Sequence, residues 1–117
     1  MSTKVWAHRG ASAYAPENTL PAFRLAMEQG ADGVELDAQL SSDGKLMVIH
    51  DEWVDRTSNG RGRVVDMTCQ ELKKLDFSNG MANYAPARIP TLKEVYGLLR
   101  GSSLTVNVEI KYGEVEY

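Results

Sequence analysis

Two stretches of the chain alternate strictly between apolar and polar positions. In residues 33–40 and again in residues 104–111, every second side chain is apolar and the side chains between them are polar. A period of two is typical of a β-strand that buries one face. Shorter apolar runs predict two more strands, at residues 4–7 and 46–49, and Trp6 on the first of these is expected to belong to the core.

Three other segments have the apolar spacing of helices. The first follows Asn18 or Thr19, either of which can cap a helix that Gly30 would end. Two more helices are predicted at residues 71–75 and 92–99, each preceded by a threonine with a glutamate three residues later. That spacing is a capping box, a common signal for the start of a helix.

The order of these elements predicts an α/β fold with a parallel sheet, because strands alternate with helices. Residues 46–49 leave two interpretations open. A turn at residues 42–43 would make them an antiparallel hairpin arm, with Glu35 paired to His50; otherwise they are a third parallel strand. The connection is shorter than the dozen or so residues that a parallel crossover takes, which favours the hairpin.

Charged residues lie within both long strands. Glu35 and Asp37 share one face, about 6.6–7 Å apart along the strand, and Glu109 and Lys111 repeat the arrangement on the second. Burying such carboxylates unpaired would be costly. A divalent cation would offset that cost, and an all-oxygen site suits Mg²⁺ or Ca²⁺. The alternative is a solvated face on an open sheet.

The chain has two histidines, and each follows a predicted strand. His8 is next to Arg9, and His50 is next to Asp51. Parallel α/β proteins place their active sites at the carboxyl ends of strands. A single histidine there is more often structural, but two in equivalent places predict a catalytic acid–base pair.

Composition narrows the class of protein further. The 117 residues suit one domain, and a net charge of −3 argues against a nucleic-acid partner. Arg56, Arg61 and Arg63 are interspersed with acidic residues and are interpreted as a solvated loop. No apolar run is long enough for a membrane span. With Cys69 as the single cysteine and no secretory signal, a cytoplasmic location is expected.

Five segments of the sequence, taken together, resemble the glycerophosphodiester phosphodiesterase family. In chain order they read HRGASAYAPENTLPAF, GVELDAQLSSDGKLMVIHD, DRTSNGRG, RIPTLKEV and VEIK. The resemblance implies a TIM barrel of the phosphodiesterase type. Because such a barrel takes roughly 250 residues, residues 1–117 are expected to be a partial domain. They would hold about the first half of the barrel and lack the C-terminal half, and would need that half or self-association.

The resemblance also implies an activity and a site. The family hydrolyses glycerophosphodiesters, a small-molecule substrate, to glycerol 3-phosphate and an alcohol, so this chain is expected to be a phosphoric diester hydrolase; whether the half is active alone stays open. The implied roles are general acid and base for His8 and His50, binding of Ca²⁺ or Mg²⁺ for Glu35, Asp37 and Glu109, phosphate contact for Arg9 and Lys111, and support from Glu17, Asn18 and Asp51.

Two other functions stay open at this point. One is a related lyase that leaves a cyclic phosphate, as in the bacterial phosphoinositide-specific phospholipases C. Many of those work without a metal, and the paired carboxylates argue against that. The other is a non-enzymatic half-barrel that a cation stabilises and that folds only on assembly.

Overall fold

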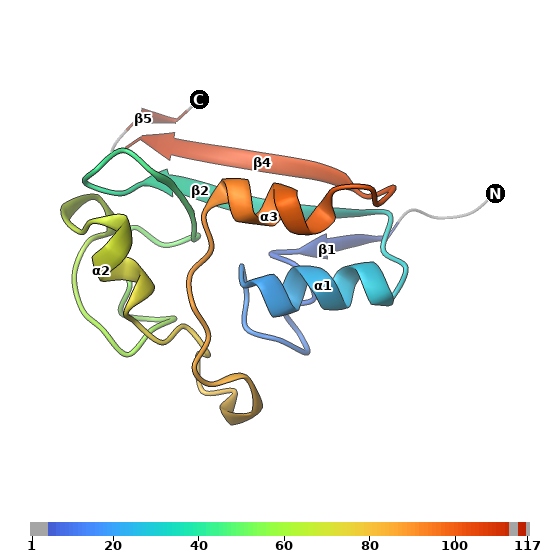
Figure 1. The fold of residues 1–117 in the computed structure, drawn as a ribbon, viewed down its shortest axis with the longest axis horizontal. Helices are drawn as coiled ribbons and strands as arrows, with labels where there is room; N and C mark the ends of the chain where they lie inside the picture. The colour runs from blue at the N-terminus through green and yellow to red at the C-terminus, as the bar shows by residue number, and fades with distance from the viewer. Residues whose placement is uncertain (1–4, 113–114, 117) are drawn as a thin grey trace.

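The computed structural model describes residues 5–112 and 115–116 of the chain, and side chains as far as residue 110. Strands and helices alternate through this part of the chain (Figure 1). The strands are β1 (Trp6–His8), β2 (Gly33–Leu40), β3 (Leu46–Val48), β4 (Thr105–Tyr112) and β5 (Val115–Glu116). The α-helices are α1 (Leu20–Glu28), α2 (Cys69–Lys73) and α3 (Leu92–Leu99), with short 3₁₀ turns at Val64–Asp66 and Ala82–Tyr84.

The sheet is built around β2. Strands β1 and β4 pair with it in parallel, one on each edge, and β5 pairs antiparallel with the outer side of β4. The β2–β4 ladder runs from Gly33 opposite Thr105 to Gln39 opposite Lys111. This parallel α/β arrangement is the fold class that the alternation of strands and helices predicts. The pattern did not predict β5.

Strand β3 is the second arm of an antiparallel hairpin with β2, which confirms that interpretation. The expected pairing of Glu35 with His50 is wrong, however. The last hydrogen bond between these segments is donated by the Ile49 N–H to the Asp37 carbonyl, at 2.9 Å. On that edge Glu35 pairs with His8 instead, because β1 already occupies this end of β2.

The helices begin where the caps predict. Thr19, and not Asn18, caps α1 and accepts a hydrogen bond from the Ala22 N–H at 3.4 Å. Thr68 and Thr91 each complete a reciprocal capping box, at the start of α2 and α3. None of the helices in the described residues is long and apolar enough to cross a membrane.

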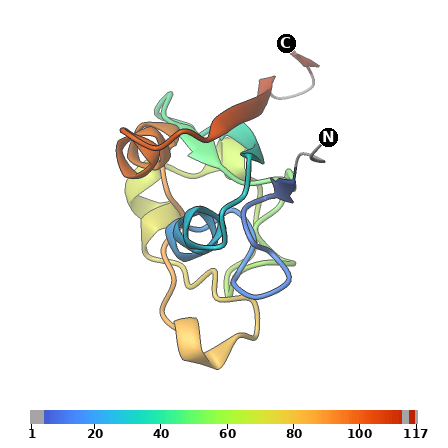
Figure 2. The ribbon, with the colours of Figure 1, turned by 90° about the vertical axis from the view of Figure 1, so that its right-hand side faces the viewer.

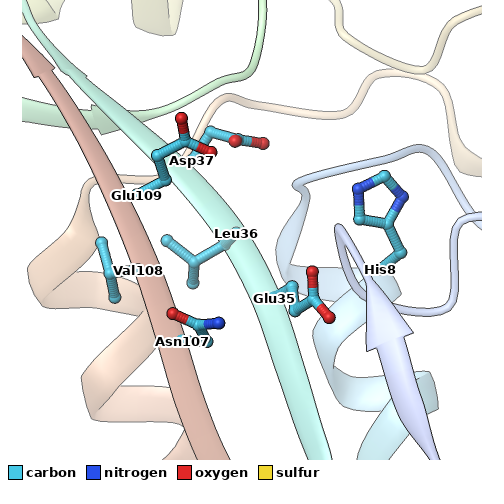
Figure 3. A pocket seen from close by; sticks show the side chains of 7 residues that line it. All are labelled: His8, Glu35, Leu36, Asp37, Asn107, Val108 and Glu109. Carbon is cyan, nitrogen blue, oxygen red and sulfur yellow. The ribbon is translucent and has the colours of Figure 1, made fainter. Parts of the chain in front are cut away.

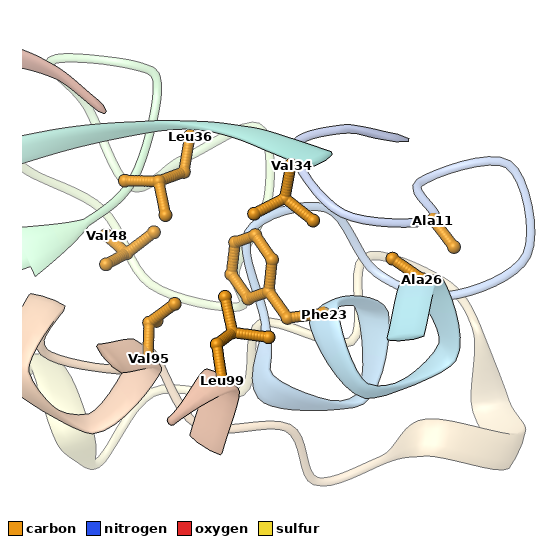
Figure 4. Close-up of a cluster of buried hydrophobic side chains, with 8 residues drawn as sticks. All are labelled: Ala11, Phe23, Ala26, Val34, Leu36, Val48, Val95 and Leu99. Carbon is orange, nitrogen blue, oxygen red and sulfur yellow. The ribbon is translucent and has the colours of Figure 1, made fainter. Parts of the chain in front are cut away.

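The main core lies between the sheet and helices α1 and α3, which cover the same face (Figures 2 and 4). Phe23 of α1 is fully buried and lies against Val34 and Leu36 of β2. On the other side of the cluster, α3 contributes Val95 and Leu99. Since both helices use one face, the opposite face of β2, with Glu35 and Asp37, is left for polar side chains.

A second core holds the long excursion between β3 and α3. Its buried members are Met47, Ile49, Val54, Val64, Leu72, Phe77 and Ile89. Leu72, from α2, is fully buried in it. Met47 of β3 and Ile49, which directly follows this strand, both belong to the cluster. The second core therefore fixes the position of the chain just before His50.

Trp6 is not in the core as expected: 40% of its surface is exposed. Alternation along β1 explains this result, because Ala7 packs against the main core and so turns its neighbours to the opposite face. The Trp6 ring crosses Gly33, where a Cβ atom would lie 2.7 Å from the ring. Trp6 therefore shares its face of the sheet with His8.

Candidate active site

The loop after β1 brings His8 and Arg9 to the sheet edge. The Arg9 N–H donates to the Glu35 carbonyl at 2.6 Å, and Arg9 then takes a left-handed conformation with φ of 56°. Gly10 follows with φ of 77°, so close to α1 that a Cβ atom would lie 2.8 Å from the backbone and side chain of Ala22. The glycine therefore allows the tight turn after Arg9 that brings the loop against α1.

Three carboxylates line one cavity of about 300 Å³ together with His8 (Figure 3). Glu35 and Asp37 come from β2, and Glu109 comes from β4. Asp37 and Glu109 are register partners on adjacent parallel strands, whose backbones lie about 4.8 Å apart. Asn107, the register partner of Glu35, completes the polar part of the lining.

The ionisable donors in this cavity are mainly carboxylates, whose oxygens are the ligands that hard divalent cations prefer. Asp37 is 7% exposed, and the described residues offer it one cation, Arg9, whose Nε lies 3.7 Å from its Oδ2. Among the described side chains, Glu35 and Glu109 have no ion-pair partner. As they stand, no three of the described histidine, cysteine, aspartate and glutamate side chains are close enough to ligate one ion. The register places Asp37 beside Glu109 on adjacent strands, and Glu35 lies two residues before Asp37 on the same face of β2.

Arg9 connects the cavity to the following loop. Its Nη1 donates to Glu17 at 3.2 Å, and its Nε faces Asp37. The side chain of Arg9 is 20% exposed. Arg9 therefore presents a partly buried positive charge at the rim of the carboxylate cavity, where an anionic group could contact it.

His50 approaches the same part of β2 from the opposite direction. It follows the Ile49–Asp37 hydrogen bond, whereas His8 is paired with Glu35. The side chain of His50 lines a small cavity beside Glu17, and not the carboxylate cavity. Its Nδ1 lies 2.9 Å from Oδ1 of Asp51.

Asp51 and Glu17 are joined by Arg56, a residue that was expected only in a solvated loop. The Arg56 guanidinium donates to Asp51 at 2.8 and 3.0 Å and to Glu17 at 2.7 and 3.0 Å. The hydrogen bond from Arg56 lowers the pKa of Asp51 to about 2. Burial opposes ionisation of Glu17, but Arg56 and Arg9 outweigh it and leave the pKa of Glu17 below its usual range.

The side chain of Gln39 holds the turn at His50 by hydrogen bonds to backbone carbonyls. Its side-chain N–H₂ lies 3.2, 2.9 and 2.7 Å from the carbonyl oxygens of Ile49, His50 and Asp51. Gln39 is 8% exposed and occupies the polar face of β2, two residues after Asp37. That spacing was visible in the sequence, although the acceptor carbonyls belong to a turn whose path it does not give.

Two expected site residues remain, Asn18 and Lys111, and the structure describes the side chain of the first but not of the second. Asn18 is buried in a left-handed conformation with φ of 55°, and neither of its side-chain polar atoms has a hydrogen-bond partner in the described chain. Because Thr19 caps α1, Asn18 is free of that role. Lys111 pairs with Gln39 through the backbone register, but its side chain lies outside the described residues.

The chain resembles known proteins over nearly its whole length. The model of the glycerophosphoryl diester phosphodiesterase family matches residues 8–116. The chain belongs to this family. A glycerophosphodiester phosphodiesterase of Caldanaerobacter subterraneus is 56% identical over the whole chain, which covers 49% of that relative. The chain thus spans about half the length of the curated relatives it matches.

Solved structures of the family share the fold. A glycerophosphodiester phosphodiesterase from Agrobacterium tumefaciens has a TM-score of 0.89 at 46% identity, over 95% of this chain and 48% of that one. An Oleispira antarctica phosphodiesterase, solved with the product sn-glycerol-3-phosphate, has a TM-score of 0.91 at 40% identity, over 96% of this chain and 46% of its own. These neighbours are TIM-barrel enzymes, which confirms the predicted fold of about half a barrel.

Proposed function

We propose that this chain contributes the metal and acid–base groups of an enzyme that hydrolyses glycerophosphodiesters to glycerol 3-phosphate and an alcohol. The observation that carries the proposal is the single cavity that His8 shares with Glu35, Asp37 and Glu109. Family membership and the product complex of the Oleispira relative support the same substrate class.

In this proposal the three carboxylates hold a divalent cation, Ca²⁺ or Mg²⁺. When bound, the cation neutralises negative charge on the phosphoryl oxygens. Arg9 contacts a phosphoryl oxygen from the rim of the cavity, and so stabilises charge that builds up in the transition state. Lys111 supplies a further positive charge to the phosphate.

The two histidines move the protons. Asp51 accepts a hydrogen bond from Nδ1 of His50, so in the neutral imidazole Nε2 is the acceptor and takes a proton from the attacking hydroxyl or water. His8, exposed at the end of β1, gives a proton to the leaving alcohol oxygen. Glu17 and Asp51 support this pair through their bonds to Arg9, Arg56 and His50, and the backbone N–H of Asn18 donates to the Arg9 carbonyl at 2.8 Å.

We also propose that the substrate pocket is complete only with the barrel strands that the relatives have beyond the matched region. The chain can therefore be assayed both alone and joined to the second half of the Caldanaerobacter relative. We expect the joined protein to release glycerol 3-phosphate from glycerophosphocholine in the presence of Ca²⁺ or Mg²⁺. A joined protein that folds but does not hydrolyse this substrate would contradict the proposal.

The roles of the histidines have their own test in the same joined protein. Removing one general acid or base costs about 10²–10⁴-fold in rate, so His8→Ala and His50→Ala should each lose at least a hundredfold. Tyr14→Phe, on an exposed side chain of the same loop as Arg9, is the matched control and should retain activity. Full activity in either histidine variant would exclude acid–base catalysis by that residue.

Product analysis separates hydrolysis from the lyase reaction. Phosphorus NMR of the assay should show glycerol 3-phosphate as the final product. A cyclic phosphate ester that persists after the substrate is consumed would identify a lyase instead.

A further inference from the structure

We propose that Arg56 is a positioning residue that keeps His50 in its Nδ1-protonated tautomer and fixes the His50 turn against the loop that carries Arg9. Arg56 acts through two carboxylates, Asp51 and Glu17. The proposal rests on the proposed function only where it predicts an effect on turnover, because the tautomer of His50 can be measured without a substrate.

The first step is the geometry of the Arg56 guanidinium. Its Nε and Nη2 donate to the two oxygens of Asp51, and its Nη1 and Nη2 donate to the two oxygens of Glu17. Four of the five N–H groups of an arginine are thereby used. Two carboxylates face one guanidinium, so this cluster has no net positive charge to offer a phosphate. Arg56 is therefore assigned to positioning and not to substrate binding.

The second step concerns the proton on His50. With a pKa of about 2, Asp51 is ionised at neutral pH. An ionised carboxylate only accepts hydrogen bonds. The 2.9 Å contact between Nδ1 of His50 and Oδ1 of Asp51 therefore requires the proton on Nδ1. The other ring nitrogen is then the acceptor that a general base needs.

The third step is what fixes Asp51 itself. The same Oδ1 that meets His50 also accepts from Nη2 of Arg56, while Oδ2 accepts from Nε. Two parallel bonds hold the plane of the carboxylate in one orientation. Without Arg56, Asp51 is a one-quarter-exposed aspartate that can rotate away into water.

The fourth step joins two distant segments. Arg56 and Glu17 are 39 residues apart in the chain, and Glu17 also accepts from Arg9. The sequence of contacts therefore runs from His50 through Asp51, Arg56 and Glu17 to Arg9. Arg56 is the only residue among those described that bonds to both carboxylates.

The chain is well suited to a direct test, because it has two histidines. Labelling histidine with ¹⁵N gives two imidazole spin systems, and a His8→Gln variant assigns them. At a pH where His50 is neutral, we expect Nδ1–H as its major form in the unaltered protein. Arg56→Gln should make Nε2–H the major form. Arg61→Gln, an exposed arginine of the same loop, is the matched control and should leave the spectrum of His50 unchanged.

Two further variants make the result decisive. In an Asp51→Asn background, Arg56→Gln should produce no additional change in the His50 spectrum, because Arg56 acts through Asp51. Arg56→Lys keeps the positive charge but loses the paired N–H donors of the guanidinium, and should give a mixture of His50 tautomers. It replaces Arg56→Gln as the test if that variant does not fold. A folded Arg56→Gln or Arg56→Lys protein in which His50 stays Nδ1-protonated to the same extent as before would overturn the proposal.

Turnover gives the second readout, in the joined protein described above. Arg56→Gln should lower kcat by about tenfold to a hundredfold and leave KM unchanged, since small displacements of catalytic groups have effects of this size. An unchanged kcat together with an altered tautomer would contradict the positioning role. The expected tautomers in a protein without any turnover would contradict the proposed function and still support the effect of Arg56 on the His50 tautomer.

Discussion

At the scale of single residues, the side chains that make the site are held by partners far away in sequence. Asp37 faces Arg9, Glu17 binds Arg56, and Gln39 holds the turn at His50. The residue types and their spacing were enough to predict that Glu35, Asp37 and Glu109 share one face of the sheet, where they line a cavity with His8. They were not enough to predict Arg56 or Gln39, because the partners of these residues depend on the path of the chain between β3 and α3.

Gly10 offers a test of the Arg9 loop at this scale. Gly10→Ala should lower the free energy of unfolding by more than the 1–3 kcal/mol or so that a left-handed residue alone costs, since the new Cβ atom would also lie 2.8 Å from Ala22. Gly44→Ala is the control, because Gly44 has φ of 80° but a Cβ atom added there would have no neighbour within 4 Å. Urea unfolding of both variants measures the difference, and equal losses would show that the contact with α1 is unimportant.

The charged cluster around Arg56 predicts a dependence of stability on pH. The pKa of Asp51 is lowered from 3.8 to about 2 by Arg56, so its stabilising effect is complete above 3.8 and is lost as the pH falls towards 2. Partly exposed ion pairs contribute about 0.2–1 kcal/mol each. Arg56→Gln should therefore destabilise the protein by about 1 kcal/mol near neutral pH.

The difference between the two proteins should shrink as the pH is lowered from about 4 to 2. Urea unfolding at a series of pH values measures it, with Arg61→Gln as the control that should follow the unaltered protein throughout. A difference between Arg56→Gln and the unaltered protein that stays constant across this range would argue against the ion pair as its cause.

At the scale of elements, the sequence predicts the helices and strand β2 clearly. Residues 33–40 form β2 with the bounds that alternation predicts, and Thr91 caps α3 through the expected box. Local signals suffice there because capping and alternation act within a few residues. Register does not follow from them: the mistaken pairing of Glu35 with His50 arose because β1 and β3 share one edge of β2.

The cap of α3 is testable on its own. Thr91→Ala removes the acceptor for the Glu94 N–H, now bonded at 3.1 Å, and should cost about 1 kcal/mol of stability. Thr91→Ser keeps a hydroxyl at the cap and should retain most of it. Thermal or urea unfolding compares the three proteins, and a loss in Thr91→Ser as large as in Thr91→Ala would point to the methyl group and not to the cap.

At the scale of the whole molecule, one face of the sheet packs against helices and the other carries ionisable side chains. Helices α1 and α3 cover the first face, whereas Glu35, Asp37 and Glu109 line the cavity with His8. This division could be predicted, because it follows from alternation along two strands. The exposure of Trp6 and the second core could not, since both depend on how separate segments meet.

The central claim is that carboxylates from β2 and β4 form one cation site, and calorimetric titration of the folded protein with Ca²⁺ and Mg²⁺ tests it most directly. We predict one bound cation per chain, with affinity reduced at least tenfold in Asp37→Asn and in Glu109→Gln. Glu28→Gln, on the exposed side of α1, should bind as the unaltered protein does. Folded protein that binds neither ion, or that binds equally well after either substitution, would contradict the account.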